Sequence, residues 1–385
     1  MSSLPKVLIV GGPDVDTRLD LMHHLTSNFK IRAVGSLPSL SSKFKKEGFS
    51  YNNYHLNRET NPVSDFKTVR ELIKIFKQTK PHIVHTFDTK PGVWARLAAQ
   101  VAGVPVIIGT IPGLGSLYSN NSLKTRLIRP IYQRLQKTAC HFSDLTIFQN
   151  HSDARQFIDA NVVSPQKAKV ILGSGVSTGT FSIANVAEKT REKTRRELNI
   201  RPGEAVVTMI SRVIRTKGVL EYMAAVKNIR KSFPKTHFLL IGAADEENVD
   251  RLNTTETTTL KQTVNWPGAR SDIREILAIS DIFVLPSAYR EGIPRVLLEA
   301  ASMGLPIVTT DSPGCNEVVE ENVNGYFVQP KDAPALAQRI IQLLAEPNLR
   351  HSFGAASRQK AVAQFDLSVV ANHTQNIYQE MLEKL

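Results

Sequence analysis

Short apolar runs alternate with amphipathic segments along almost the whole chain. Among the amphipathic segments, residues 65–80 are typical of a helix, with Leu72 and Phe76 on one face. Strands that are joined through helices pair in parallel and are covered on both faces. The alternation therefore predicts doubly wound α/β sheets. Strands are expected at 6–12, 31–36, 82–87, 104–110, 144–149 and 168–175, and then at 205–211, 236–243, 282–288, 305–311 and 325–330.

Two domains are expected from the length and from one gap in the pattern. The 385 residues exceed one ordinary domain. The segment 174–200 is polar and lacks a long apolar run, so a linker is expected within it. We expect an N-terminal domain over 1–178 and a C-terminal domain over 179–365. In sheets of this kind, ligands bind beyond the carboxyl ends of the strands.

Positive charge is concentrated in the first half. The net charge is +13, and residues 1–180 carry 23 Lys and Arg against 11 Asp and Glu, whereas the remainder carries 25 against 24. This asymmetry indicates an anionic partner for the N-terminal half. A nucleic acid is not expected, because no zinc finger is present and the basic residues are not interleaved with stacking aromatic residues.

Cysteine usage and hydropathy indicate a cytoplasmic protein that is soluble or peripheral to a membrane. Cys140 and Cys315 lie in different halves without metal-ligand spacing, so neither a disulfide framework nor a metal site is expected. No apolar run approaches the roughly 20 residues that span a bilayer. The N-terminal apolar run is short and is interpreted as a first strand rather than as a signal peptide.

A basic strand-to-helix connection predicts an anion site in the second half. In "MISRVIRTKG", Arg212 and Lys217 lie between a strand and a helix that begins near residue 219. Backbone N–H groups and the helix dipole attract anions there, and two cations add to that attraction. The segment predicts a diphosphate site; the alternative is a solvated basic loop. Arg270, in "PGARSD", follows another short strand and faces either this site or solvent.

Two glutamates stand at a place where only packing is expected. Glu291 precedes Gly292 and Pro294 in a loop, and Glu299 interrupts the apolar helix that follows. A carboxylate among apolar residues needs partners, because burying it unpaired is costly. Sugar or ribose hydroxyls are suitable partners. The alternative is that Glu291 interacts with the helix dipole and Glu299 pairs with a nearby arginine.

The ordered set of segments resembles a known family. "SRVIRTKG", "GARSDIREIL", "LPSAYREGIPRVLLEAASMGLPIVTTDSPGCNEVV" and "NGYFV" follow in the order found in the retaining glycosyltransferases of family 4. That family has the GT-B fold, in which two Rossmann-like domains face a central cleft. Its signature is two glutamates separated by seven residues, the spacing of Glu291 and Glu299. The C-terminal segment 366–385 resembles the helices that pack back on the N-terminal domain.

The resemblance implies a role for each matching donor residue. Arg212 and Lys217 would hold the donor diphosphate and stabilise the leaving group. Glu291 would contact the donor sugar near its reacting carbon, together with the adjoining Gly292, and Glu299 would bind the ribose hydroxyls. The remaining donor contacts would come from Gly11, Gly12, Arg270, Gly314, Cys315 and Asn316. The segment "IGAADEE" replaces a more usual Gly-x-Gly turn, so base contacts there are not carried over.

The N-terminal half is expected to bind the acceptor. Residues 85–118 resemble a subgroup that extends sugars on polyprenyl diphosphates, and the matching residues include His85, Lys90, Gly113 and Gly115. Many family members carry a histidine where this chain has Pro112. Lys90 binds an acceptor phosphate or is a solvated lysine, and His85 is functional or structural; both alternatives stay open at this point.

The implied activity is retaining, metal-independent transfer without a cofactor. A hexose or N-acetylhexosamine would move from a nucleotide diphosphate donor, UDP-linked in the subgroup, to a polyprenyl-diphosphate-linked sugar or related glycan in surface polysaccharide assembly. No Asp-x-Asp motif is placed for a metal. Basic segments at 40–49 and 122–139 predict contact with an anionic membrane, at the inner face of the cytoplasmic membrane. The alternatives are a soluble acceptor, either a sugar phosphate or a polysaccharide, and a nucleotide-sugar epimerase.

Overall fold

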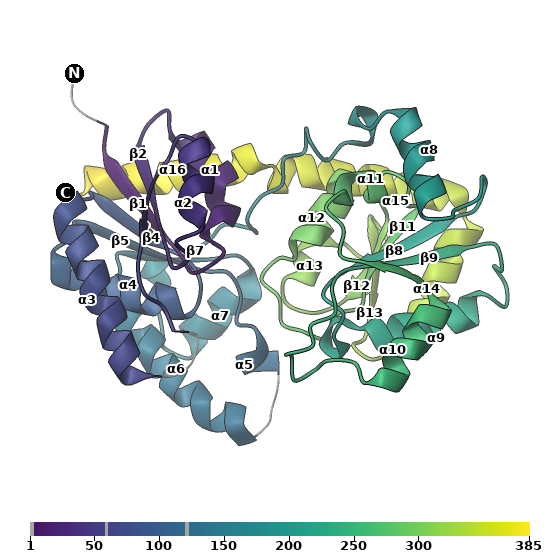
Figure 1. Ribbon diagram of the computed structural model, residues 1–385, viewed down its shortest axis with the longest axis horizontal. Coiled ribbons are helices and arrows are strands. Elements are labelled where there is room, and N and C mark those ends of the chain that lie inside the picture. The colour runs from purple at the N-terminus through teal and green to yellow at the C-terminus, as the bar shows by residue number, and fades with distance from the viewer. Residues whose placement is uncertain (1–3, 58–60, 120–122) are drawn as a thin grey trace. The chain divides into compact units, whose positions relative to one another are not determined.

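The computed structural model describes residues 4–57, 61–119 and 123–385 (Figure 1). It divides into two compact units, one formed by Met1–Leu172 with Leu367–Leu385 and the other by Gly173–Asp366. Each unit is built around one parallel sheet, and the prediction of two doubly wound α/β domains is confirmed.

The first unit contains a parallel sheet in the order β3-β2-β1-β4-β5-β6-β7. Its strands are β1 (Lys6–Val10), β2 (Lys30–Gly35), β3 (Ser50–Asn53), β4 (Ile83–Thr86), β5 (Val106–Ile111), β6 (Leu145–Phe148) and β7 (Ala168–Val170). Its helices are α1 (Leu19–Leu25), α2 (Leu40–Lys46), α3 (Pro62–Thr79), α4 (Lys90–Ala102), α5 (Ser116–Ser119), α6 (Leu123–Phe142), α7 (His151–Asp159) and α16 (Leu367–Glu383).

Neighbouring residues of one strand enter different cores in this unit. Val7 and Ile9 of β1 pack in one cluster, whereas Leu8 and Val10 pack in another. Successive side chains of a strand point to opposite faces, so both faces of the sheet are covered. This double burial explains why the strand reads as a continuous apolar run. Helix α16, yellow in Figure 1, lies beside α1 and contributes Tyr378 to the first cluster.

The second unit contains a parallel sheet in the order β10-β9-β8-β11-β12-β13. Its strands are β8 (Val206–Ile210), β9 (His237–Ile241), β10 (Asn265–Gly268), β11 (Ile282–Leu285), β12 (Ile307–Thr310) and β13 (Gly325–Val328). Its helices are α8 (Glu188–Glu197), α9 (Val219–Ile229), α10 (Thr254–Thr263), α11 (Ile273–Leu277), α12 (Arg295–Ser302), α13 (Cys315–Val318), α14 (Ala333–Ala345) and α15 (Pro347–Lys360).

Helix ends follow local capping chemistry. The Asn61 side chain accepts the N–H of Ser64 at the start of α3, and Asn253 and Glu256 form a reciprocal capping box at the start of α10. Helix α4 ends at Gly103, which has φ 70° and adopts the left-handed conformation at low steric cost. These signals fix where α3 and α10 begin and where α4 ends.

No helix in the described ranges has both the length and the apolar character needed to cross a bilayer.

Candidate functional site

The residues predicted to bind a diphosphate and a sugar gather at one edge of the second sheet. Arg212 and Lys217 follow β8, Glu291 and Gly292 follow β11, and Gly314 follows β12. These three strands are neighbours in the sheet and run parallel, so their carboxyl ends meet at the same edge. The topology therefore brings together residues that are up to about a hundred positions apart in the sequence.

An ion pair between Lys217 and Glu291 joins two of these loops. Lys217 Nζ bonds to Glu291 Oε1, and the two side chains are only 12% and 13% exposed. Ser287 Oγ donates to the same carboxylate oxygen over 3.2 Å. Lys217 Nζ also lies 5.1 Å from the ring centroid of Tyr289, a favourable cation–π geometry. The pair therefore places an ammonium group and a carboxylate, both largely shielded from solvent, beyond the carboxyl ends of β8 and β11.

Two glycines allow the loops to approach this closely. Gly218 has φ 80°, and a Cβ placed on it would lie 2.1 Å from the carbonyl oxygen of Pro286. Gly314 has φ 86°, and a Cβ there would lie 1.3 Å from the carbonyl oxygen of Gly292. A side chain at either position would force the loops apart, and with them the residues on either side.

Arg212 is held by an acid that sequence reasoning did not identify. Its Nη1 donates to Asp245 Oδ2 over 2.8 Å, and its side chain is 52% exposed. Asn248 Nδ2 donates to the same Asp245 oxygen over 3.1 Å. Asp245 belongs to the segment that departs from the family's Gly-x-Gly turn. The exposed guanidinium can exchange this partner for a ligand phosphate at little cost, because exposed ion pairs contribute little stability.

Glu299 is buried on α12 and pairs with an arginine one turn earlier. Arg295 Nε donates to Glu299 Oε1 over 3.0 Å. Burial raises the pKa of the Glu299 carboxyl, and the charge and hydrogen bond of Arg295 act in the opposite direction. The arginine partner expected under the structural alternative for Glu299 is therefore present. For Glu291 the partner is Lys217 rather than a helix terminus.

Arg270 lies on the side of the sheet where α8 and α11 pack. It bonds both carboxylate oxygens of Asp272 and, over 3.1 Å, Glu197 Oε2. The hydrogen bonds that Arg270 donates to Asp272, reinforced by the one to Glu197, raise the pKa of the guanidinium, and the same contact lowers the pKa of Asp272. Asp272 precedes α11, but its side chain makes no capping hydrogen bond because it holds Arg270 instead.

Cys315 and Asn316 form the first turn of α13. Their backbone N–H groups donate to the Ser312 carbonyl over 3.0 and 3.1 Å, and Asn316 Nδ2 donates to Asp311 Oδ1 over 3.0 Å. Burial, followed by the negative charge of Glu291, raises the pKa of the Cys315 thiol to about 11. The thiol is therefore a neutral packing group at neutral pH.

The glycines after β1 are engaged within the first unit. The Gly12 N–H donates to Asp88 Oδ2 over 2.9 Å, and a Cβ on Gly11 would lie 3.1 Å from the Val15 side chain. Asp88 stands after β4 with φ 71°, a conformation that few non-glycine residues adopt. Burial, with the nearby charge of Asp14, raises the pKa of the Asp88 carboxyl. Asp88 is a residue of this region that sequence reasoning missed.

The contacts of His85 favour its structural alternative. Its side chain is buried, Nδ1 lies 2.6 Å from the Tyr378 hydroxyl, and Nε2 lies 2.6 Å from Thr110 Oγ1. Burial, reinforced by the charge of Arg18, lowers the pKa of the imidazole to about 3, so the ring is neutral at physiological pH. His85 thereby ties β4 to β5 and to α16.

Lys90, Gly113 and Gly115 lie at the ends of β4 and β5. Lys90 begins α4, and its Nζ lies 2.7 Å from Asp65 Oδ1 and 2.8 Å from the Asn57 carbonyl oxygen. It is therefore not the solvated lysine of the alternative interpretation. Gly113 and Gly115 lie in the loop between β5 and α5, and Gly115 has φ 59°.

Across the ranges that the structure describes, no cluster of three or more His, Cys, Asp or Glu side chains is arranged to hold a metal ion.

Family models match both halves of the chain. The model described as glycosyl transferases group 1 matches residues 190–360, and the model described as glycosyl transferase 4-like matches residues 24–150. The first match contains the Lys217–Glu291 pair and the loop of Gly314. The second contains Lys90, His85 and the loop after β5.

Two relatives align along most of the chain. The N,N'-diacetylbacillosaminyl-diphospho-undecaprenol alpha-1,3-N-acetylgalactosaminyltransferase of Campylobacter jejuni is 30% identical over 350 residues, covering 90% of this chain and 89% of the relative. The UDP-Gal:alpha-D-GlcNAc-diphosphoundecaprenol alpha-1,3-galactosyltransferase of Escherichia coli is 28% identical over 329 residues, covering 85% and 82%.

A solved structure shares the fold. The crystal structure of a glycosyltransferase from Rickettsia africae matches with a TM-score of 0.82 at 20% identity, over 100% of each chain. This likeness confirms the GT-B fold class expected from the sequence.

Replacing Gly314 by alanine tests the packing of the loops. Gly304→Ala is the matched control, because Gly304 has φ 76° but a Cβ there would meet nothing nearer than 3.5 Å. Gly304→Ala should lower the free energy of unfolding by about 1–2 kcal/mol, because alanine is strained in the left-handed conformation. Gly314→Ala should cost about 2–5 kcal/mol, since Gly292 must also move. Urea unfolding measures both, and equal losses would show that the loops are not in contact.

Proposed function

The chain belongs to the group 1 glycosyltransferases of the family 4 type, and from this premise we propose that it extends a polyprenyl-diphosphate-linked saccharide with a sugar from a UDP-linked donor. Both relatives described above carry undecaprenol diphosphate in the names of their substrates, and one name specifies UDP-galactose. Their alignment over more than four fifths of the chain is the observation that carries the proposal. An N-acetylhexosamine or a hexose is the proposed group transferred. Family membership favours transfer over the epimerase alternative.

Charge at the strand ends supports a donor site in the second unit. Transfer leaves negative charge on the departing diphosphate and positive charge on the sugar ring. Arg212 and Lys217 would neutralise the diphosphate, and the paired Glu291 would then turn to the sugar. Glu299 would accept hydrogen bonds from the ribose hydroxyls, either in place of the bond from Arg295 or in addition to it. Gly11, Gly12 and Arg270 would complete the donor contacts, and Lys90 with the Gly113–Gly115 loop would meet the acceptor.

The proposed chemistry retains the anomeric configuration. The bond from the anomeric carbon to the diphosphate oxygen breaks, and the acceptor oxygen forms its bond on the same face. The acceptor proton passes to the departing phosphate oxygen. In this scheme Glu291 supports the developing positive charge but forms no covalent bond. Two cations would take the role that a divalent metal has in other transferases.

Helix α6 supports contact with a membrane. Leu127 and Ile131 lie one turn apart and are 75% and 62% exposed, beside exposed Arg126 and Arg134. This exposure shows that neither side chain packs into the core. An apolar stripe flanked by cations suits an anionic bilayer surface, to which a polyprenyl acceptor is confined. The second basic segment contributes only charge, because Phe44 is fully buried in the core and stacks on Tyr51.

The proposed reaction is tested with purified enzyme, UDP-N-acetylhexosamines and UDP-hexoses, and polyprenyl-diphosphate-linked saccharides. Glu291→Gln should lower turnover about 10²–10³-fold, because it removes charge that acts on the transition state, while nucleotide affinity changes little. Glu275→Gln, which removes a carboxylate paired with Arg274 in the same unit, is the control and should retain turnover. Product masses report the transfer. Absence of transfer to every lipid-linked acceptor, with transfer to a free sugar phosphate or polysaccharide, would overturn the proposed acceptor.

Metal independence is tested by chelation. Turnover should be unchanged in excess EDTA, because Arg212 and Lys217 supply the charge that the leaving diphosphate needs. Lys217→Met should lower turnover about 10²-fold or more under the same conditions. Loss of activity in EDTA that magnesium restores would contradict the proposal.

Membrane contact is tested by sedimentation with vesicles that contain phosphatidylglycerol. The double variant Leu127→Ser and Ile131→Ser should partition at least about tenfold less, since each apolar side chain contributes about 1.5–3 kcal/mol when fully buried. The control pair is Val101→Ser and Val249→Ser, which changes two apolar residues outside α6 that are at least as exposed as Ile131. If the two double variants bind the vesicles equally well, α6 does not contact the membrane.

A further inference from the structure

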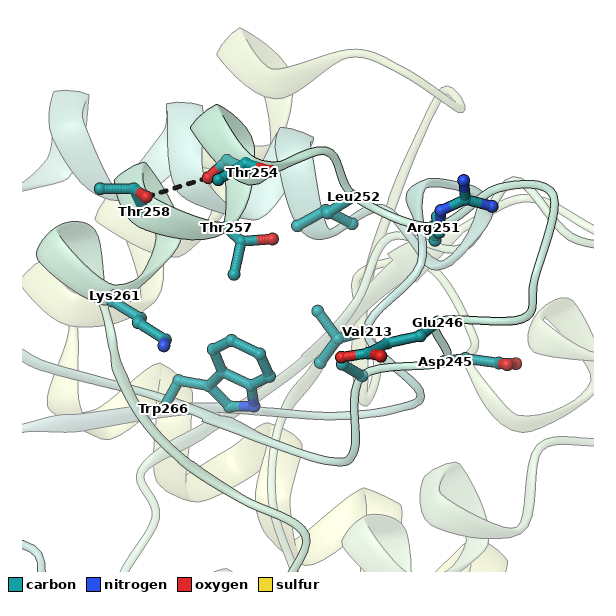
Figure 2. A pocket seen from close by; sticks show the side chains of 11 residues that line it. Val213, Asp245, Glu246, Arg251, Leu252, Thr254, Thr257, Thr258, Lys261 and Trp266 are labelled. Carbon is teal, nitrogen blue, oxygen red and sulfur yellow. Dashed lines mark hydrogen bonds between the residues drawn. The ribbon is translucent and has the colours of Figure 1, made fainter.

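A pocket of about 660 Å³ lies in the second unit, beside the residues that hold Arg212 (Figure 2). Its volume is within the range of about 300–1,000 Å³ that is usual for small-molecule sites. The walls come from α10, from the loop after β9 and from β10. The lining residues are Val213, Ala244, Asp245, Glu246, Arg251, Leu252, Thr254, Thr257, Thr258, Lys261 and Trp266.

The lining of this pocket contains none of the residues proposed to contact the nucleotide. Helix α10 packs on α9 and β10, whereas α12, which carries Glu299, packs on α11 and α15. Figure 1 shows α9 and α10 on one side of the strands of the second unit, and α8, α11 and α15 on the other. Arg270 is tied to Glu197 of α8. The proposed ribose and base contacts, Glu299 and Arg270, therefore lie on the opposite face from the pocket, whereas the proposed diphosphate contact Arg212 borders the pocket through Asp245.

Trp266 gives the pocket an oriented aromatic wall. Its Nε1 donates to the Gly242 carbonyl over 2.8 Å, which fixes the indole in the close-up of Figure 2. Lys261 Nζ is 6.0 Å from the ring centroid, at the outer limit of a cation–π contact, so the ring face can be shared with a ligand. Val213 and Leu252 extend the apolar surface next to it.

The polar groups around the indole suit a neutral polyol. Threonine hydroxyls project from one side of α10, and Thr258 Oγ1 donates back to the Thr254 carbonyl over 2.9 Å. Two acids, Asp245 and Glu246, balance two cations, Arg251 and Lys261, so the pocket has no net charge with which to select a phosphate. A pyranose ring has an apolar C–H face that can pack on the indole of Trp266. Its hydroxyls can form hydrogen bonds with the carboxylates and threonine hydroxyls of the lining.

We propose that this pocket is a carbohydrate-binding site that holds a pyranose unit of a neutral oligosaccharide against Trp266. The proposal concerns binding alone and does not depend on the transfer reaction. Asp245 belongs both to the pocket lining and to the Arg212 ion pair, so a bound saccharide would lie next to the group proposed to hold the donor diphosphate.

Tryptophan fluorescence can report binding directly, because the chain contains only two tryptophans, Trp94 and Trp266. Trp94→Phe removes the other fluorophore, and no hydrogen bond is lost, since Trp94 Nε1 has no partner in the described part of the chain. In this background, tryptophan emission is titrated with N,N',N''-triacetylchitotriose, maltotriose and a galactotriose. We expect a saturable change with at least one of them, and no competition from UDP.

Variants assign the binding to the pocket. The double variant Glu246→Ala and Thr257→Val should weaken the observed affinity at least tenfold. Thr255→Val is the matched control, because Thr255 lies on the same helix outside the pocket lining, and it should leave affinity unchanged. The proposal is overturned if no trisaccharide gives a saturable change, if the double variant binds as the parent does, or if UDP displaces the saccharide. Each of these results is independent of whether the enzyme transfers sugar.

Discussion

The ion pair between Lys217 and Glu291 is the interaction on which the proposed donor site depends. The two residues lie in loops that follow different strands, and both side chains are largely buried. Neither charge could remain there without the other, because an unpaired buried charge is strongly destabilising. Arg212 with Asp245, and Glu299 with Arg295, repeat the same arrangement at the edges of the site. The site without donor is therefore neutralised by its own acids. A diphosphate would exchange places with carboxylates, and Glu291 would be released where a sugar ring is expected.

The two units differ in their net charge. The second unit is nearly neutral in sequence, and its acids and bases are largely paired with one another around a compact cluster of strand ends. The first unit carries most of the excess positive charge, and on α6 that charge flanks exposed leucine and isoleucine. We interpret the first unit as the one that meets an anionic surface and a lipid-linked acceptor. Family membership alone would not distinguish the two units in this way.

Apolar pattern and motif order were sufficient to predict the two parallel sheets and the loops that gather at one edge of the second sheet. The polar edge strand β3 was not predicted, because "SYNN" has no apolar run. Pairings such as Arg212 with Asp245, Gly12 with Asp88 and Arg270 with Glu197 were also missed, since each joins segments that are brought together only by the fold. Within the basic segment 40–49, Phe44 is flanked by lysines in the sequence, yet its ring is fully buried, because only the fold brings the core residues around it.

The most direct test is a crystal structure with a non-transferable UDP-sugar analogue. We expect diphosphate oxygens within hydrogen-bond distance of Arg212 and Lys217, with Lys217 Nζ moved from the Glu291 carboxylate to a phosphate. We also expect a sugar ring beside Glu291. An analogue bound away from these side chains, with the Lys217–Glu291 pair unbroken, would contradict it.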